Sequence, residues 1–211
     1  KITASEQHSG LRFEKSKGVF LDNLEVVFDS TEPGVVVSNE SNVYASNLKI
    51  HDIAETLVVV NHSHLCLNNS SLFKTKANGL YVSKDAYVDI NNCDIHDTEY
   101  PAIFLQSSKG RICNNTIYNI PQNAVSINNS NGIISRNTIY DVSGSGVAFL
   151  DNSTGGAYSN HIYKMGGNGI YASGKAYIRV VKNIIHDNQY PGVAILHQCT
   201  ADVYYNEISN I

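Results

Sequence analysis

Long apolar runs are missing from this chain of 211 residues, and none approaches the 18 residues that a membrane-spanning helix needs. Charged residues are also scarce, at 16% of the sequence with a formal net charge of -4, and Lys and Arg form no cluster. We therefore expect neither a membrane span nor a nucleic-acid-binding surface. With 42% hydrophobic residues, the chain can bury a continuous core, and we treat residues 1–211 as a single domain.

Paired cysteine motifs are absent as well. The four cysteines form no Cys-x-x-Cys pair and have no spacing typical of a metal site; they are Cys66, Cys93, Cys113 and Cys199. A disulfide framework is therefore not expected, and buried or half-buried thiols are the simpler interpretation. The eight histidines include no two at ligand spacing within one repeat of the sequence, so we expect no metal site and no cofactor.

The sequence does contain a repeat of 22 to 24 residues along nearly its whole length. Its first element is a small residue followed by an apolar, a variable and an apolar residue. These elements begin at Gly10, Gly34, Thr56, Gly79, Ala102, Ala124, Gly146, Gly169 and Gly192. A fixed period of this length indicates one structural unit stacked on itself.

A second element repeats with the same period and has the pattern Asn-x-Ile followed by a ring-bearing residue in most copies. Its asparagines are Asn115, Asn137, Asn160, Asn183 and Asn206, and the same position is filled earlier by Leu24, Leu48, Ser70 and Cys93. A third apolar run, such as Val43–Ala45, lies between the two elements. Each repeat thus holds three short runs of alternating apolar residues, and no run is long enough for a helix.

Three short strands per repeat predict an all-β fold, a right-handed parallel β-helix of about nine coils. A β-propeller blade needs about twice this period, and the Leu-x-x-Leu-x-Leu frame of leucine-rich repeats is missing. We expect the repeated Asn to occupy a tight left-handed bend, with its amide bonded to the equivalent amides of neighbouring coils. The small residue should lie at a corner where a larger side chain would clash.

The segments Gly169–Ala172 and Asn137–Asp141 resemble the right-handed parallel β-helix repeat proteins of the pectin-lyase-like class, particularly their copper-pathway periplasmic and polyuronate C5-epimerase branches. This resemblance covers nearly the whole chain and implies a scaffold, not a reaction. It favours an extracellular or periplasmic location. Because the repeat is already in register at Gly10 and continues through Asn206, we expect either part of a longer chain or a mature chain with short caps.

The third run of each repeat places a ring-bearing side chain on its outer face. These side chains are His51, Phe73, His96, Tyr118, Tyr140, Tyr163 and His186. At a strand spacing of about 4.8 Å, they would form a line about 29 Å long, edged by the carboxylates and amides of the next position. Such a line suits the binding of an extended polysaccharide, because ring faces pack on sugar rings. Stacked rings also stabilise neighbouring strands, and the sequence leaves both interpretations open.

Candidate catalytic residues follow the same run in the segment that contains His96, Asp97 and Tyr100. A His beside an Asp with a nearby Tyr is the set that a polyuronate epimerase or lyase uses to remove the C5 proton. The Asp-Pro-His-Asp motif expected of the epimerases is absent, and the outer face of the first run lacks the acidic residues that hold calcium in pectate-lyase-like enzymes. The coils also carry no long insertions that would wall off a cleft. Whether the chain is an enzyme therefore stays open.

An alternative function is a rigid protein-interaction or spacer scaffold. The outer face of the first run would present an apolar strip, made of Val36, Val58, Tyr81 and Phe104, to a protein partner or to the chain's own cap. Our preferred hypothesis remains a module that binds an extended polysaccharide, with uronic-acid polymers among the candidate ligands, along an exterior groove.

Overall fold

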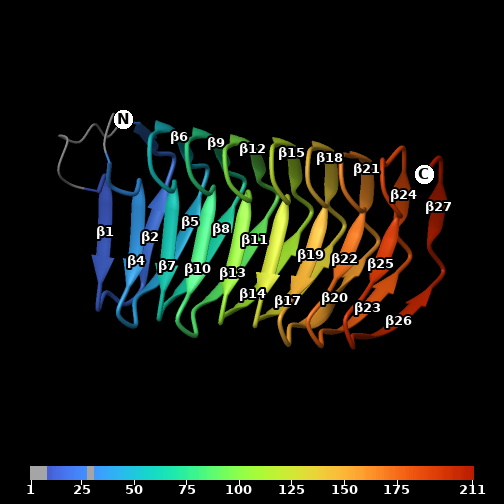
Figure 1. Cartoon of the computed structure of the whole chain (residues 1–211). Coiled ribbons are helices and arrows are strands. Elements are labelled where there is room, and N and C mark those ends of the chain that lie inside the picture. The colour runs from blue at the N-terminus through green and yellow to red at the C-terminus, as the bar shows by residue number, and fades with distance from the viewer. Residues whose placement is uncertain (1–8, 28–30) are drawn as a thin grey trace.

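The computed structural model describes residues 9–27 and 31–211, which form 27 β-strands and, within these ranges, no helix (Figure 1). The strands wind into three parallel sheets of nine strands each. Every third strand joins the same sheet, so each coil contributes one strand to each sheet. The all-β parallel β-helix of about nine coils that the repeat predicts is therefore confirmed.

The first sheet contains the small-residue elements. Its strands, in spatial order, are β1 (Leu11–Glu14), β4 (Val35–Ser38), β7 (Val58–Asn61), β10 (Leu80–Ser83), β13 (Ile103–Gln106), β16 (Val125–Asn128), β19 (Val147–Leu150), β22 (Ile170–Ala172) and β25 (Val193–Ile195).

The second sheet contains the apolar runs between the two repeated elements. Its strands are β2 (Val19–Asp22), β5 (Asn42–Ser46), β8 (His64–Asn68), β11 (Tyr87–Asn91), β14 (Lys109–Cys113), β17 (Asn131–Ser135), β20 (Thr154–Tyr158), β23 (Tyr177–Val181) and β26 (Thr200–Tyr204).

The third sheet carries the ring-bearing positions, and most of its strands run along the upper edge of the molecule in Figure 1. Its strands are β3 (Glu25–Val27), β6 (Lys49–Ile53), β9 (Ser71–Thr75), β12 (Asp94–Thr98), β15 (Thr116–Ile120), β18 (Thr138–Val142), β21 (His161–Met165), β24 (Ile184–His186) and β27 (Glu207–Ser209).

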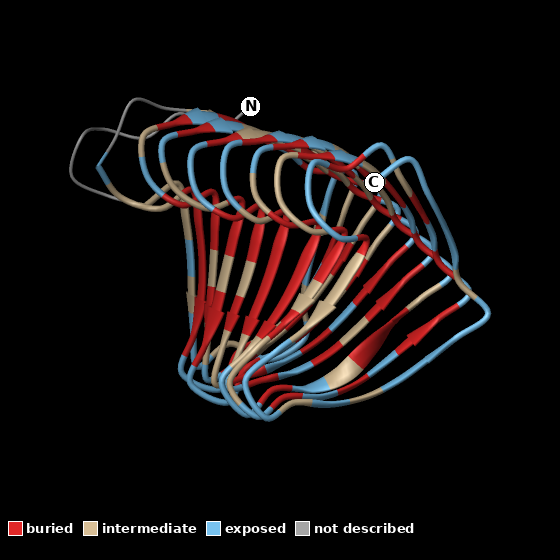
Figure 2. Ribbon diagram, turned by 45° about the vertical axis from the view of Figure 1, so that its right-hand side comes forward, coloured by how far each residue is buried: buried red, intermediate tan, exposed pale blue. Residues whose placement is uncertain are grey.

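The core is a stack of inward-facing aliphatic side chains from all three sheets, and buried positions run through the strands while the turns are largely exposed (Figure 2). In the third sheet, for example, Ile95 is paired with Leu72 and Ile117 on the neighbouring strands, and all three are fully buried. Each inward side chain therefore packs on its counterparts one coil away, at the strand spacing of a parallel sheet.

The register of the third coil differs from the prediction by one residue. Strand β4 pairs with β7 so that Val35 lies opposite Val58 and Val36 opposite Val59. The residue equivalent to Gly34 is thus Leu57, not Thr56. The prediction was wrong here because it required a small residue at this corner, whereas this coil places a buried leucine there.

The asparagine ladder is confirmed. The Nδ2 groups of Asn115, Asn137, Asn160 and Asn183 each donate to the Oδ1 of the next asparagine, across 2.9 to 3.0 Å, and the last acceptor is Asn206. Each Oδ1 also accepts the backbone N–H of the residue one coil earlier. The ladder thereby satisfies polar groups that would be costly to leave unpaired in a buried corner.

The expected left-handed bend lies one residue before the ladder, so this part of the prediction was wrong. The positive φ angles belong to the residues that precede the ladder, namely Asn114, Arg136, Ser159, Lys182 and Tyr205. Most of these side chains have no preference for this conformation, and non-glycine residues adopt it at a cost of about 1 to 2 kcal/mol. The stacking of coils, more than local propensity, therefore sets the bend.

The small corner residues and the thiols agree with the predictions. A Cβ atom added to Gly169 would lie 2.5 Å from the carbonyl oxygen of Gly192, so this corner has no room for a side chain. All four cysteines are free thiols. Burial raises the pKa of Cys93 to about 11, which keeps this thiol protonated and unreactive at neutral pH.

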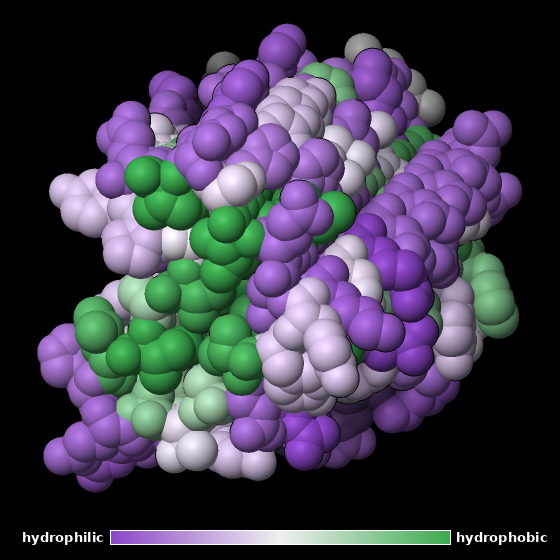
Figure 3. Space-filling model, turned by 90° about the vertical axis from the view of Figure 1, so that its right-hand side faces the viewer, coloured by the Kyte–Doolittle hydropathy of each residue, from purple (hydrophilic) through white to green (hydrophobic). Residues whose placement is uncertain are grey.

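The C-terminal end of the β-helix presents apolar side chains to the surface (Figure 3). Val203, Ile208 and Ile211 are each about half exposed in the last coil. Within the described ranges, the structure contains no helix that could cross a membrane.

Candidate functional site

The seven ring-bearing side chains of the third sheet form one continuous stack. Neighbouring ring centroids lie 4.6 to 5.2 Å apart, and neighbouring ring planes differ by only 3 to 12°. The stack runs from His51 to His186 in the order predicted from the sequence. In-register pairing of the strands produces this arrangement, because it places each ring directly above the ring of the previous coil.

Stacking at this spacing determines which parts of the rings a ligand can contact. Each inner ring has another ring against both of its faces, so a sugar ring cannot pack on those faces as the sequence analysis expected. Only the edges of the stack remain available, and these carry the hydroxyl groups of Tyr118, Tyr140 and Tyr163 and the ring nitrogens of His96. The stack can thus contribute hydrogen bonds along its edge.

The position after each ring adopts the left-handed conformation in every coil from β6 to β24. The φ angles of this column lie between 52 and 58°, and its residues are Asp52, Lys74, Asp97, Asn119, Asp141, Lys164 and Asp187. Because the backbone bends here, the charged or amide side chain points to the surface, and the next residue, such as Ile53 or Thr98, is buried. We call these seven residues the polar column.

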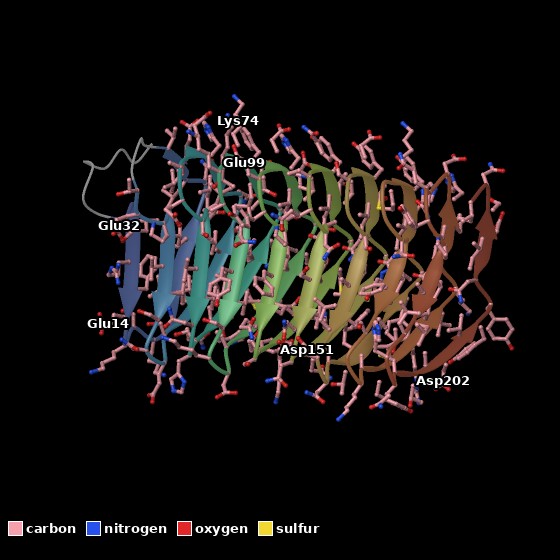
Figure 4. All side chains as sticks on the ribbon, viewed as in Figure 1. Glu14, Glu32, Lys74, Glu99, Asp151 and Asp202 are labelled. Atoms are coloured by element: carbon pink, nitrogen blue, oxygen red, sulfur yellow. The ribbon has the colours of Figure 1, made fainter. Side chains whose placement is uncertain are left out.

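A groove of about 620 Å³ runs beside the polar column across five consecutive coils. It is lined by the polar-column residues from Asp52 to Asp141 and by residues two positions further along the chain, including Lys76, Glu99 and Pro121. Figure 4 shows Lys74 projecting outward at this edge of the β-helix, with Glu99 on the same edge. Lys74 Nζ lies 3.6 Å from Asp52 Oδ1, so neighbouring coils neutralise part of each other's charge. The groove is open and linear, and its lining combines charged, amide and apolar side chains.

Three coils carry a His–Asp pair, and the three pairs differ in the environment of the second ring nitrogen. Nδ1 of the histidine faces the following carboxylate at 2.5 Å in His51–Asp52 and at 2.8 Å in His96–Asp97 and His186–Asp187. Nε2 of His51 also contacts Glu25 at 3.1 Å, and Nε2 of His186 contacts His161. Among the described residues, Nε2 of His96 alone in this set has no hydrogen-bond partner.

His96 therefore has the geometry of a general base. Its Nδ1–H donates to Asp97, which fixes the tautomer and leaves a lone pair on Nε2. Phe73 and Tyr118 hold the imidazole between them at centroid distances of 4.9 and 4.6 Å. Asp97 also accepts a hydrogen bond from Asn119 and lines the groove in its central coil.

The structure does not bring the third predicted catalytic residue to this pair. Tyr100 lies beyond the groove, with its side chain about half exposed, and its backbone carbonyl accepts a hydrogen bond from Thr98. No contact joins its hydroxyl to His96 or Asp97 among the described residues. Its assignment as a catalytic residue remains a prediction.

A carboxyl group that the sequence analysis missed lies on the other side of the ring stack. Asp94 faces outward two residues before His96 and lines a hollow of about 440 Å³ together with Thr116, Tyr118 and Tyr140. Its Oδ1 is buried and has no hydrogen-bond partner. Burial raises the pKa of Asp94, and His96 partly offsets this effect. In the sequence, the only sign of this group is that Asp94 occupies a position at which the next two coils have threonine.

The apolar strip predicted on the first sheet does not exist as an exposed surface. Val58 faces inward and is 1% exposed, because of the register difference described above, and Val36 is only 5% exposed. Val59 takes the outward position, and Tyr81 packs against Phe104 at a centroid distance of 5.6 Å. The basis for a scaffold function on this face is therefore lost.

The geometry defines the molecule as a parallel β-helix with an exterior groove and a stacked ring column. The chain belongs to the family of right-handed β-helix regions, which it matches over residues 1–109 and 78–211. No curated protein matches the sequence.

Several solved structures are similar in fold. The periplasmic alginate epimerase AlgG, as a T265N mutant, is 14% identical with a TM-score of 0.73, covering 86% of this chain and 50% of its own. Pectate lyase Pel9A is 10% identical with a TM-score of 0.76, covering 97% of this chain and 68% of its own.

The A-module of the Azotobacter vinelandii mannuronan C-5 epimerase AlgE6 is 11% identical with a TM-score of 0.58, covering 99% of this chain and 82% of its own. The present chain thus spans about half the length of the first of these structures. Identities this low establish a shared fold and nothing further.

Proposed function

We propose that this chain is a carbohydrate-directed module that binds an extended acidic polysaccharide along the groove beside the polar column. The observation that carries the proposal is the shape of the groove, which crosses five coils and receives at least one charged or amide side chain from each. A linear site with a regular repeat suits a linear polymer with a regular repeat. The hydroxyl groups of such a polymer need many donors and acceptors, and the groove supplies them.

The groove lining holds two lysines beside four carboxylates, and the lysines are the groups that can pair with an acidic polymer. Lys74 and Lys76 come from the same coil and line the groove together. Lys74 lies near Asp52, whereas Lys76 has no ion pair with a described residue and is exposed. Its ammonium group can therefore pair with the carboxylate of a uronic acid unit. Each such exposed pair contributes about 0.2 to 1 kcal/mol, so binding depends on several coils acting together.

The similar structures favour the same class of ligand. They are described as alginate, mannuronan and pectate enzymes, and all three names refer to acidic polysaccharides. The alginate epimerase is a periplasmic protein, and an extracellular or periplasmic location is our proposal for this chain.

We extend the proposal to chemistry at His96. Its Nε2 lone pair would remove the proton from C5 of a uronic acid unit, with Asp97 stabilising the imidazolium that forms. In elimination, the C5 electron pair forms the C4–C5 double bond and the O4 substituent leaves. In epimerisation, a second group returns a proton to the opposite face of C5. Asp94 lines the hollow on the other side of the ring stack, so for a polymer in the groove the returning proton would come from water.

The experiment has a binding arm and a chemical arm. Purified protein is titrated with polyuronates and with neutral polysaccharides, and Lys76→Glu is compared with Lys109→Glu, an exposed lysine on the second sheet. We expect polyuronate binding that weakens with salt and with Lys76→Glu but not with Lys109→Glu. Binding only to neutral polymers, or equal losses in both variants, would refute an acidic ligand in this groove.

In the chemical arm, C5 proton exchange in deuterated water and the absorbance of unsaturated products are measured on the same samples. We expect His96→Gln to abolish exchange or elimination, and His197→Asn, an exposed histidine next to Ser173, to leave it unchanged. Polyuronate binding without any exchange or elimination by the native protein would reject the catalytic role of His96 while the binding module stands.

A further inference from the structure

The hollow beside the ring stack is separate from the groove, and the two share no lining residue. It has a volume of about 440 Å³ and crosses three coils, with Asp94 from β12, Thr116 and Tyr118 from β15 and Tyr140 from β18. Strand pairing places Asp94 directly opposite Thr116, so the carboxylate and the hydroxyl occupy the same outward column. A volume of this size is in the range of sites that bind single small molecules.

The carboxylate of Asp94 is the group in this hollow that points to a ligand. Its Oδ1 is buried and has no hydrogen-bond partner among the described residues. The lining contains neither Lys nor Arg, and Arg136 in the next coil donates from Nε to Asn114 Oδ1 at 2.9 Å. A carboxylate taken from water without a partner is costly, and burial accordingly raises the pKa of Asp94, an effect that His96 partly offsets. A cation in the hollow would favour the ionised carboxylate.

The rest of the lining supplies neutral polar groups. These are the hydroxyls of Thr116, Tyr118 and Tyr140 and the amide of Asn92. Within the part of the chain that the structure describes, none of these four side chains has a hydrogen-bond partner. Burial, followed by the negative charge of Asp94, raises the pKa of Tyr118, so its hydroxyl stays protonated at neutral pH. Each hydroxyl can donate or accept, which suits a ligand that carries several hydroxyl groups of its own.

We propose that this hollow binds one cationic amino sugar unit, with the ammonium group on Asp94 and the sugar hydroxyls on Thr116, Tyr118 and Tyr140. The positive charge of the ligand follows from the unpaired carboxylate, and its hydroxyls follow from the unpaired hydroxyls of the lining. Hydrogen bonds from an ammonium group to a carboxylate are roughly twice as strong as neutral ones. This ligand is opposite in charge to the acidic polymer proposed for the groove, so each site can be tested without the other.

The test is an NMR titration of the full chain with three probes, at a pH below the pKa of their amines. Glucosamine carries both the ammonium group and the sugar hydroxyls. N-acetylglucosamine keeps the hydroxyls but has no positive charge, and ethanolamine keeps the ammonium group but has no sugar ring.

Two matched variants remove one carboxylate each. Asp94→Asn removes the charge in the hollow and keeps the shape of the side chain. Asp85→Asn is the control, because Asp85 is exposed, lies outside the hollow and has a left-handed backbone that asparagine tolerates. Thermal unfolding followed by circular dichroism shows that both variants remain folded.

We expect glucosamine to bind at least about tenfold more tightly than either of the other probes, because only glucosamine pairs with the carboxylate and the hydroxyls together. The largest chemical-shift changes should fall on Asp94, Thr116 and Tyr118, and not on groove residues such as Lys76. Asp94→Asn should weaken glucosamine binding by at least about tenfold and leave N-acetylglucosamine binding unchanged, whereas Asp85→Asn should affect neither.

Four results would overturn the proposal. The first is the absence of glucosamine binding, and the second is equal affinity for glucosamine and N-acetylglucosamine, since the hollow would then not recognise the positive charge. The third is unchanged glucosamine affinity in Asp94→Asn. The fourth is ethanolamine binding as tight as that of glucosamine, which would exclude a role for the sugar hydroxyls.

Discussion

The asparagine ladder makes a quantitative prediction about stability at Asn160. This side chain is 1% exposed and makes four hydrogen bonds. It donates to Ile134 O at 2.9 Å and to Asn183 Oδ1 at 2.9 Å. Its Oδ1 accepts from Asn137 N at 2.9 Å and from Asn137 Nδ2 at 3.0 Å. Replacing Asn160 with Ala removes all four at once.

The magnitude follows from the groups left without partners. Asn183 Oδ1 still accepts from the backbone N–H of residue 160, and Asn137 Nδ2 still donates to Ile112 O. The backbone N–H of Asn137 and the carbonyl of Ile134 lose their side-chain partner in a buried corner. Each such group costs about 1 to 3 kcal/mol, so we expect Asn160→Ala to lower the free energy of unfolding by about 2 to 6 kcal/mol.

The chain itself provides a matched control. Ser70 occupies the same position in an earlier coil, and its Oγ accepts the backbone N–H of Leu48 at 3.0 Å. Asn160→Ser should therefore keep an acceptor for Asn137 N and lose at least about 1 kcal/mol less than Asn160→Ala. An exposed hydrogen bond between neighbouring coils gives a second control, in which Asn131 Nδ2 donates to Thr154. Asn131→Ala should change the free energy of unfolding by no more than about 0.5 kcal/mol.

The assay is urea unfolding followed by circular dichroism and by a fluorescence probe, since repeat proteins can lose two-state behaviour and the two signals must coincide. A loss below about 1 kcal/mol in Asn160→Ala would refute the reasoning. So would equal losses in the Ala and Ser variants, because stability would then depend on side-chain volume and not on the hydrogen bonds.

Three further predictions concern the ring stack, the partly buried Asp94 and the thiols. Tyr140→Ala removes two stacking contacts of about 0.5 to 1.5 kcal/mol each and should destabilise the protein by at least about 1 kcal/mol more than Tyr140→Phe, as measured by urea unfolding. The pKa of Asp94 is raised in the folded state, so its ionisation opposes folding at pH values above the ordinary pKa of an aspartate. Asp94→Asn should therefore increase stability at pH 7. This gain should vanish when unfolding is measured at low pH, where Asp94 is protonated in both the folded and the unfolded protein. Iodoacetamide should label the half-buried Cys66 before Cys93 and Cys113 in the native protein, and mass spectrometry of the labelled peptides checks the order; first labelling of Cys93 would contradict its burial.

The repeat made the fold predictable, because the asparagine of the ladder and the alternating apolar residues recur with the same period, once in each coil. The single error of register occurred in the one coil whose corner does not hold a small residue. Leu57 fills a corner that glycine or alanine fills in most coils, and its burial becomes visible only when the strands are paired. The left-handed bends were also misplaced by one residue, because residues such as Arg136 and Lys182 adopt a conformation that their side chains do not favour.

The ring column and the polar column were predictable from the repeat, but the contacts of their side chains were not. The order of the ring column followed from the repeat, whereas the nearly coplanar stacking that occupies the ring faces depends on side-chain rotamers. Asp94 was missed because nothing in a single sequence distinguishes a buried acid from a solvated one. The partners of the three His–Asp pairs come from adjacent coils, and only the folded structure separates His96 from the other two.

The most direct test of the central claim is to map the binding of an acidic oligosaccharide onto the protein by NMR chemical-shift changes. The account predicts that the largest changes fall on residues of the groove, including Lys76, Asp97 and Asn119, and that neutral oligosaccharides produce none. Changes confined to the outer face of the second sheet, or no changes with any acidic oligosaccharide, would contradict it.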